Sequence, residues 1–132
     1  MRVSLFGMVG AALLAGAGLS AARAASYEFL AAPETDLNRV YRVDKATGEM
    51  SACQYGLAAE ASPDSKDAKA AIGTTLCYPP GEGGGAQAQS EYGLVASRHE
   101  REGGVFRVDL RTGTMSICYV LNEAVVCTPP AK

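Results

Sequence analysis

The sequence predicts an all-β protein in which two repeated four-stranded antiparallel units pack as a small pseudo-twofold sandwich. Three observations predict this class: an internal repeat, a hairpin-turn signature at the same place in each copy, and cysteines at matching repeat positions. The chain has 132 residues, a length typical of one domain.

The internal repeat has an offset of 65 residues. Segment 40–53 aligns without a gap with segment 105–118, and nine of the fourteen residue pairs are identical. Each copy also ends in Cys-x-Pro-Pro. We therefore divide the chain into two repeats, at about 25–80 and 91–130, joined by a Gly-rich linker at 81–90.

The N-terminal segment 1–24 has the features of a signal peptide. Arg2 gives a positive start, an apolar run follows, and small residues stand at the −3 and −1 positions of a cleavage site after Ala24. We expect a single β domain over 25–132 in a bacterial periplasmic or secreted protein. We expect no membrane span after cleavage, because no second apolar run follows.

The charge balance argues against a nucleic-acid partner. The full chain has 12 Lys and Arg against 14 Asp and Glu, and loss of segment 1–24 removes two of the arginines. An acidic chain lacks the basic patch that binds phosphate backbones.

The turn sequence Asp-x-x-Thr-Gly occurs once in each copy, at 44–48 and at 109–113. The Asp side chain accepts backbone N–H groups and Gly adopts the left-handed conformation, so each sequence predicts a hairpin with a four-residue loop. Further strands, the first beginning at Tyr27 or Tyr92, complete four strands in each copy. Alternation along the strands predicts a core face in each copy. The predicted core residues are Tyr41, Val43, Met50 and Ala52, and likewise Phe106, Val108, Met115 and Ile117.

A second hairpin in the later copy brings two cysteines together. If Asn-Glu at 122–123 forms a two-residue turn, Cys118 and Cys127 face each other at a non-hydrogen-bonded pair, with Cα atoms about 4.5 Å apart. The homologous bridge joins Cys53 to Cys77. Four cysteines in an exported chain predict two structural disulfides.

The longer first disulfide loop contains an insertion, which we place at 56–75. Ser-Pro-Asp at 62–64 is typical of a helix start, and Gly73 of a helix end. A short helix and a mobile loop both remain open for this segment.

Segments 40–48 and 105–113, Val-Tyr-Arg-Val-Asp-Lys-Ala-Thr-Gly and Val-Phe-Arg-Val-Asp-Leu-Arg-Thr-Gly, resemble the inner-strand motif of PQQ-dehydrogenase-like β-propeller blades. The resemblance implies a four-stranded, blade-like unit, but no cofactor and no catalytic residue. Cys53 and Cys118 stand where that motif usually has Trp, and closed propellers use about four to eight blades. The alternative to the sandwich is therefore that blade-like units complete a propeller by oligomerisation. The whole chain also resembles small exported bacterial proteins of unknown function.

Catalytic candidates are few. His99, the only histidine, lies in a run of alternating charges that is typical of a solvated loop, although it suits a general base or a pH-sensitive contact. A single histidine rules out a multi-histidine metal site, and the Gly-rich segment 81–86 follows Pro-Pro rather than the strand of a dinucleotide-binding motif. We expect no enzyme, no cofactor and no metal.

Arg42 and Arg107 recur on the strand face opposite the predicted core. Exposed tyrosines suit the same face or its rim: Tyr55, Tyr78 and Tyr119. Repeated Arg and Tyr on a sheet are typical of a protein, glycan or anion-binding surface. The alternative is that the two arginines pair with Glu28 and Glu91.

These patterns predict a non-enzymatic interaction module, or an accessory subunit, with a protein partner in the bacterial envelope. A small-ligand or glycan-binding protein that uses segment 56–75 and the Arg/Tyr face is the alternative. An enzyme is the hypothesis that the residues favour least.

Overall fold

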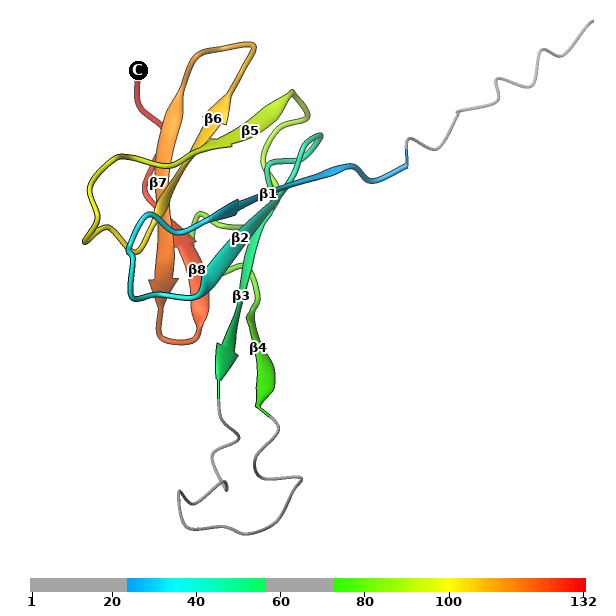
Figure 1. Ribbon diagram of the computed structural model, residues 1–132. Helices are drawn as coiled ribbons and strands as arrows, with labels where there is room; N and C mark the ends of the chain where they lie inside the picture. The colour runs from blue at the N-terminus through cyan, green and yellow to red at the C-terminus, as the bar shows by residue number, and fades with distance from the viewer. Residues whose placement is uncertain (1–23, 57–72) are drawn as a thin grey trace, which may run out of the picture.

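The computed structural model describes residues 24–56 and 73–132, and this part of the chain forms strands and no helix (Figure 1). The first four strands are β1 (Tyr27–Ala31), β2 (Arg39–Asp44), β3 (Met50–Gly56) and β4 (Thr74–Tyr78). The other four are β5 (Tyr92–Val95), β6 (Val105–Asp109), β7 (Met115–Leu121) and β8 (Ala124–Cys127). They form two antiparallel sheets, β1-β2-β3-β4 and β5-β6-β7-β8. Each sheet is one sequence repeat, so the predicted sandwich of two four-stranded units is confirmed.

The turns follow the predicted chemistry. Asp44 accepts hydrogen bonds from the backbone N–H groups of Ala46 and Thr47 at 2.8 and 3.1 Å, and Gly48 has a φ of +71°. The predicted pairs Val43–Met50 and Tyr41–Ala52 form between β2 and β3. In the β7–β8 turn, Asn122 and Glu123 have φ values of 49° and 62°, as a type I′ two-residue turn requires.

Both predicted disulfides form, Cys53–Cys77 and Cys118–Cys127, each with a Cα–Cα distance of 4.1 Å. The β3–β4 ladder continues past the first bridge to the pair Gly56–Thr74, so the ends of the predicted insertion belong to strands. Whether the rest of the insertion is a helix or a loop concerns residues outside the described ranges. The same holds for the predicted signal peptide, of which only Ala24 is described.

The two sheets bury opposite faces of the repeat. The inner face of the first sheet consists of the predicted core residues Tyr41, Val43, Met50 and Ala52, all at most 1% exposed. The second sheet buries the face that we expected to point outward. This inner face of the second sheet consists of Tyr92, Leu94, Val105, Arg107, Ser116, Cys118, Val125 and Cys127.

The predicted core face of the second repeat is therefore wrong. Met115 is 45% exposed, and its neighbours Phe106, Val108 and Ile117 are only half-buried. The physical reason is that both faces of this sheet are largely apolar, so alternation defines two faces without showing which one is covered. A twofold axis would bring equivalent faces together, whereas here one face of the first repeat packs on the opposite face of the second.

The Gly-rich linker packs against both sheets. Val125 donates its backbone N–H to the Pro79 carbonyl, and Cys127 donates to that of Glu82, so the chain between the repeats runs along the edge of β8. Met50 in the first sheet donates to the Gly84 carbonyl at 2.8 Å. A Cβ atom at Gly83, where φ is +68°, would collide with the Cys127 carbonyl oxygen. The glycines thus permit close backbone contact, which also covers a sheet edge.

Candidate functional site

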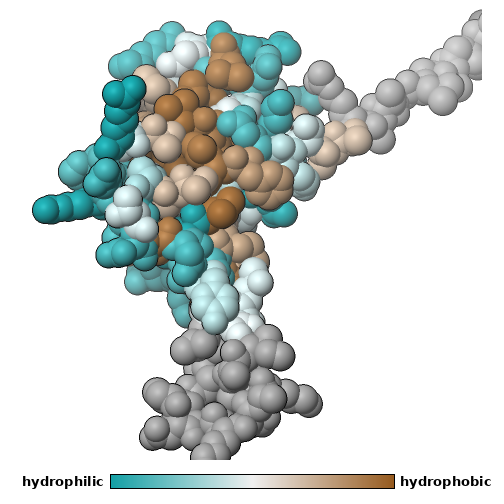
Figure 2. All heavy atoms as spheres, in the orientation of Figure 1, coloured by the Kyte–Doolittle hydropathy of each residue, from teal (hydrophilic) through white to brown (hydrophobic). Residues whose placement is uncertain are grey.

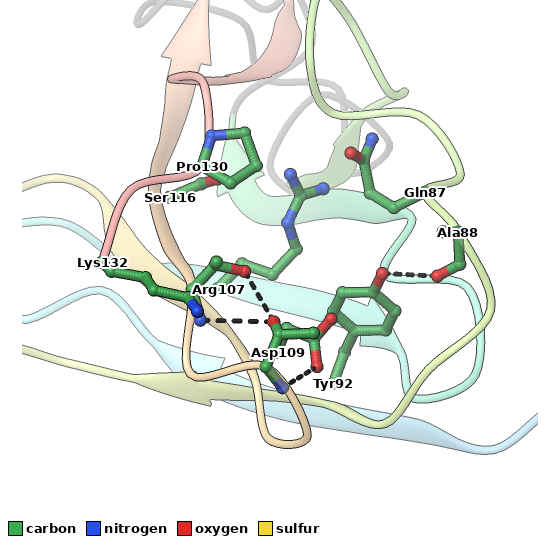
Figure 3. A pocket seen from close by; sticks show the side chains of 10 residues that line it. Gln87, Ala88, Tyr92, Arg107, Asp109, Ser116, Pro130 and Lys132 are labelled. Carbon is green, nitrogen blue, oxygen red and sulfur yellow. Dashed lines mark hydrogen bonds between the residues drawn. The ribbon is translucent and has the colours of Figure 1, made fainter.

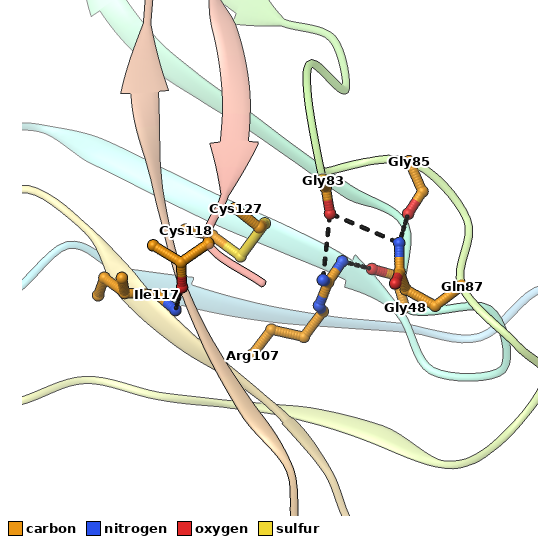
Figure 4. Close-up of a disulfide and its surroundings, with 9 residues drawn as sticks. Gly48, Gly83, Gly85, Gln87, Arg107, Ile117, Cys118 and Cys127 are labelled. Atoms are coloured by element: carbon orange, nitrogen blue, oxygen red, sulfur yellow. Dashed lines mark hydrogen bonds between the residues drawn. A yellow bond between two sulfur atoms is a disulfide. The ribbon is translucent and has the colours of Figure 1, made fainter. Parts of the chain in front are cut away.

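Arg107 lies between the two sheets and is 3% exposed. Its guanidinium donates to the Gly48 carbonyl at 2.8 Å and to the Gly83 carbonyl at 3.1 Å (Figure 4). Burial lowers the pKa of this guanidinium, although arginine stays charged at neutral pH. The sequence suggested an exposed binding residue here. The structure instead places the side chain where it joins the second sheet, the first hairpin turn and the linker.

A pocket of about 420 Å³ lies beside Arg107 (Figure 3). Asp109 on its wall accepts hydrogen bonds from the Ser90 hydroxyl at 2.8 Å and from the backbone N–H groups of Arg111 and Thr112. Burial by itself would raise the pKa of Asp109, but these hydrogen bonds outweigh it and hold the pKa below its usual value.

Tyr92 borders the same pocket and donates its hydroxyl to the Ala88 carbonyl at 2.5 Å. Burial, followed by the charge of Asp109, raises the pKa of this hydroxyl. The polar groups of Arg107, Asp109 and Tyr92 are thus already bonded within the chain. These three residues therefore offer few free groups to recognise a ligand.

Arg42, the residue aligned with Arg107, lies on the outside of the first sheet. Its guanidinium donates to the Ser51 hydroxyl at 2.9 Å and lies over the Tyr27 ring, 4.7 Å from the centroid. Glu28, its predicted acidic partner, instead accepts a hydrogen bond from the Leu94 backbone N–H. The reason is register: Glu28 pairs with Val43, so its side chain points to the inner face.

The outer face of the first sheet consists of Tyr27, Phe29, Val40, Arg42, Ser51, Cys53, Tyr55 and Cys77. Large apolar groups are exposed on it: Phe29 by 63%, Tyr55 by 58%, Tyr27 by 44% and Val40 by 42%. A shallow depression of about 410 Å³ lies between Phe29, Val40, Arg42 and the disulfide. This face therefore combines aromatic rings, an apolar hollow and one cation.

The outer face of the second sheet consists of Val95, Phe106, Val108, Met115, Ile117 and Tyr119. Val95 is 53% exposed and Tyr119 is 37% exposed. On the side of the molecule drawn in Figure 2, hydrophobic side chains gather in the middle of the surface and hydrophilic ones surround them. The molecule thus has apolar outer surface as well as an apolar core.

The predicted binding residues are divided among these places. Arg42 and Tyr55 share the outer face of the first sheet, Tyr119 lies on that of the second, and Arg107 is internal. Tyr78 packs against the core, with Arg39 over its ring. Phe29 and Val40 were not identified from the sequence as surface residues. Both share the face of Arg42, because Phe29 pairs with Arg42 across β1 and β2, and Val40 lies two residues before it in β2.

His99 lies exposed on the loop between β5 and β6, where its backbone N–H donates to the Ser97 hydroxyl. Within residues 24–56 and 73–132, no three His, Cys, Asp or Glu side chains gather as metal ligands. In the same ranges no helix is long and apolar enough to cross a membrane.

The two disulfides indicate a non-reducing compartment. Comparisons with protein-family models, curated proteins and solved structures found no match.

Proposed function

We propose that this protein is a non-enzymatic interaction module of the bacterial envelope, periplasmic or secreted, that binds a protein partner through the outer face of its first sheet. The observation that carries the proposal is the exposure of Phe29 beside Arg42 on that face. Aromatic and Arg side chains dominate the binding energy of protein interfaces, and apolar groups on a sheet face favour a partner that removes them from water.

The chemistry of the face favours a protein over a small polar ligand. Its hollow is walled by Phe29, Val40 and a disulfide, and Arg42 supplies the single cation. A glycan or small-ligand site would use the pocket near Arg107, which more polar side chains line. The polar groups of Arg107, Asp109 and Tyr92 there are already satisfied by internal hydrogen bonds, so this pocket is the weaker candidate.

Site-specific crosslinking tests the proposal. We would place a photoreactive phenylalanine analogue at Phe29 in the full chain, expressed in exporting bacteria, and analyse crosslinked species by mass spectrometry. A discrete protein adduct is expected, and Arg42→Glu should reduce its yield by about tenfold or more.

The matched control carries the same analogue at Arg98, which is exposed on the β5–β6 loop of the second repeat. No adduct is expected there. An adduct that forms equally at both positions, or that Arg42→Glu leaves unchanged, would show that the outer face is not the binding surface.

A further inference from the structure

The sheets meet through unlike faces, so one face of each kind stays unpaired in the chain. The first sheet buries the face of Tyr41, whereas the second buries the face of Val105 and Arg107. These two residues align with Val40 and Arg42, which lie on the outer face of the first sheet. An interface between unlike faces is heterologous, so it is repeated when another copy adds to either end.

The outer face of the first sheet carries the residue positions that the second repeat buries. Phe29 is 63% exposed and its aligned residue Leu94 is 7% exposed. Val40 is 42% exposed, whereas Val105 is fully buried. The first repeat therefore leaves exposed the positions with which the second repeat packs on a neighbouring sheet.

The outer face of the second sheet carries the positions that align with the inner face of the first sheet, on which the second sheet packs. Phe106 aligns with Tyr41, and Met115 aligns with Met50. Met50 is fully buried, but Met115 is 45% exposed. Apolar side chains thus occupy the same positions on both receiving faces, and only one of the two is covered.

One contact of the internal interface has an unpaired counterpart on the outer faces. Between the sheets, the Tyr92 ring lies so close to Gly48 that a Cβ there would approach the ring within 2.9 Å, and Arg107 donates to the Gly48 carbonyl. The aligned turn residue Gly113 has the same left-handed conformation, with a φ of +76° against +71° at Gly48. A Cβ at Gly113 would meet nothing within 4 Å.

The matching half of that contact is also present, on the first sheet. Tyr27 aligns with Tyr92 and is 44% exposed, with Arg42 lying over its ring. In the described residues, Tyr27 and Arg42 thus form a pair that contacts no glycine turn, and the turn at Gly113 contacts no Tyr–Arg pair.

We propose that the outer face of the first sheet binds the outer face of the second sheet of another copy of this chain, in the front-to-back manner of the internal interface. Tyr27 then lies on Gly113 of the neighbouring copy, and Arg42 donates to its carbonyl. This inference rests on the proposed function of the outer face and names its partner as a second copy.

Association between copies is expected to be weaker than the internal contact. Tyr41 donates its hydroxyl to the Gly103 carbonyl across the sheets, but its aligned residue Phe106 has no hydroxyl. Glu28 accepts a hydrogen bond from Leu94, but its aligned residue is Gly93. With two polar contacts missing, we expect reversible association that increases with concentration.

Sedimentation velocity of the disulfide-bonded chain purified from exporting bacteria tests the inference. The mass should rise with concentration past that of a dimer, because each added copy exposes a further face. Arg42→Glu, on one face, and Met115→Glu, on the other, should each leave the chain monomeric. Glu123→Lys, at the tip of the β7–β8 turn, is the control and should associate like the parent chain. Circular dichroism and disulfide mapping verify that all variants are folded.

Mixing the two monomeric variants gives the sharpest result. The Arg42→Glu chain keeps an intact second-sheet face and the Met115→Glu chain an intact first-sheet face, so the mixture should form one-to-one dimers and nothing larger. A parent chain that stays monomeric, association that survives both substitutions, or a mixture that stays monomeric would each overturn the inference.

The test also separates the two proposals. If the chain stays monomeric while the crosslinker at Phe29 yields a different protein, self-association is wrong and the proposed function stands. If Arg42→Glu changes neither the sedimentation nor the crosslink, both proposals are wrong.

Discussion

The two sheets have the same strand order and closely related sequences, yet they bury opposite faces. Arg42 and Arg107 illustrate the difference: the first lies over a tyrosine ring at the surface, and the second joins two backbone carbonyls inside the molecule. Sequence alternation determines which residues share a face. The neighbouring sheet determines whether that face is a core or a surface.

Replacing the two arginines is expected to give the largest contrast. Arg107→Ala leaves the carbonyl of the buried Gly48 without its donor and creates a cavity between the sheets, so we expect a loss of about 3 kcal/mol in the free energy of unfolding. Arg42→Ala should cost less than about 1 kcal/mol, since its hydrogen bond and ring contact are at the surface. Urea unfolding in dilute solution measures both values, and equal losses would contradict the assignment of Arg107 to the interface.

The next largest difference is expected between the rates at which the two disulfides are reduced. Cys118 is fully buried and Cys127 is 7% exposed, whereas Cys77 is exposed. A reductant should therefore cleave Cys53–Cys77 first, on the order of a hundredfold faster, the factor that about 2.7 kcal/mol of local opening gives. Alkylation under native conditions followed by peptide mapping measures the two rates. Cleavage of both bridges at one rate would mean that the sheets separate readily.

Alanine substitutions at the aligned glycines Gly48 and Gly113 measure how much the packing of the first turn contributes to stability. Both have positive φ, so alanine at either position costs roughly 1–2 kcal/mol of backbone strain. At Gly48 the new Cβ also meets the Tyr92 ring, and this overpacking should add about 1 kcal/mol or more. Thermal unfolding of the two variants gives the difference. A Gly113→Ala variant as unstable as Gly48→Ala would contradict the open space beside Gly113.

The smallest contrast is expected between Tyr41→Phe and Phe106→Tyr, because each substitution changes a single hydroxyl on an unchanged ring. Loss of the 2.6 Å hydrogen bond to the Gly103 carbonyl should cost about 1 kcal/mol. Burial raises the pKa of Tyr41, so its contribution to stability is complete below the unfolded tyrosine pKa of about 10 and is lost as the pH rises above it.

The Tyr41→Phe variant should therefore lose less stability than the parent chain between neutral and strongly alkaline pH. Some slope should remain, because burial and the charge of Asp109 also raise the pKa of Tyr92. Phe106→Tyr is the matched control and should leave the alkaline slope unchanged. Identical slopes in the parent chain and Tyr41→Phe would show that the Tyr41 hydroxyl is not buried in solution.

Local chemistry made much of the fold predictable from the sequence. The Asp44 turn, the turn at 122–123 and both disulfides depend on residues close in the chain or on strict alternation, and all were correct. The covered face of the second sheet was not predictable, because Val105 and Cys118 on one side are as apolar as Phe106 and Ile117 on the other.

The candidate site was harder to predict than the fold. Arg107 binds carbonyls 59 and 24 residues away in the chain, and no local pattern carries that information. Its identity with Arg42 in the repeat suggested one shared role, whereas tertiary contacts give the two residues different ones. The outer face of the first sheet, by contrast, follows from alternation around Arg42, and Phe29 was within reach of the same rule.

The path of the linker along β8 also bears on the order in which the molecule assembles. The chain is synthesised from its N-terminus, so the first repeat and segment 79–84 exist before Val125 and Cys127, whose backbone N–H groups donate to carbonyls of that segment. The first sheet can pair its own strands early, but Tyr41 and Met50 have no covering layer until the second sheet exists. A nascent chain cut before β8 should therefore remain sensitive to proteases at the glycines that the complete chain holds in place.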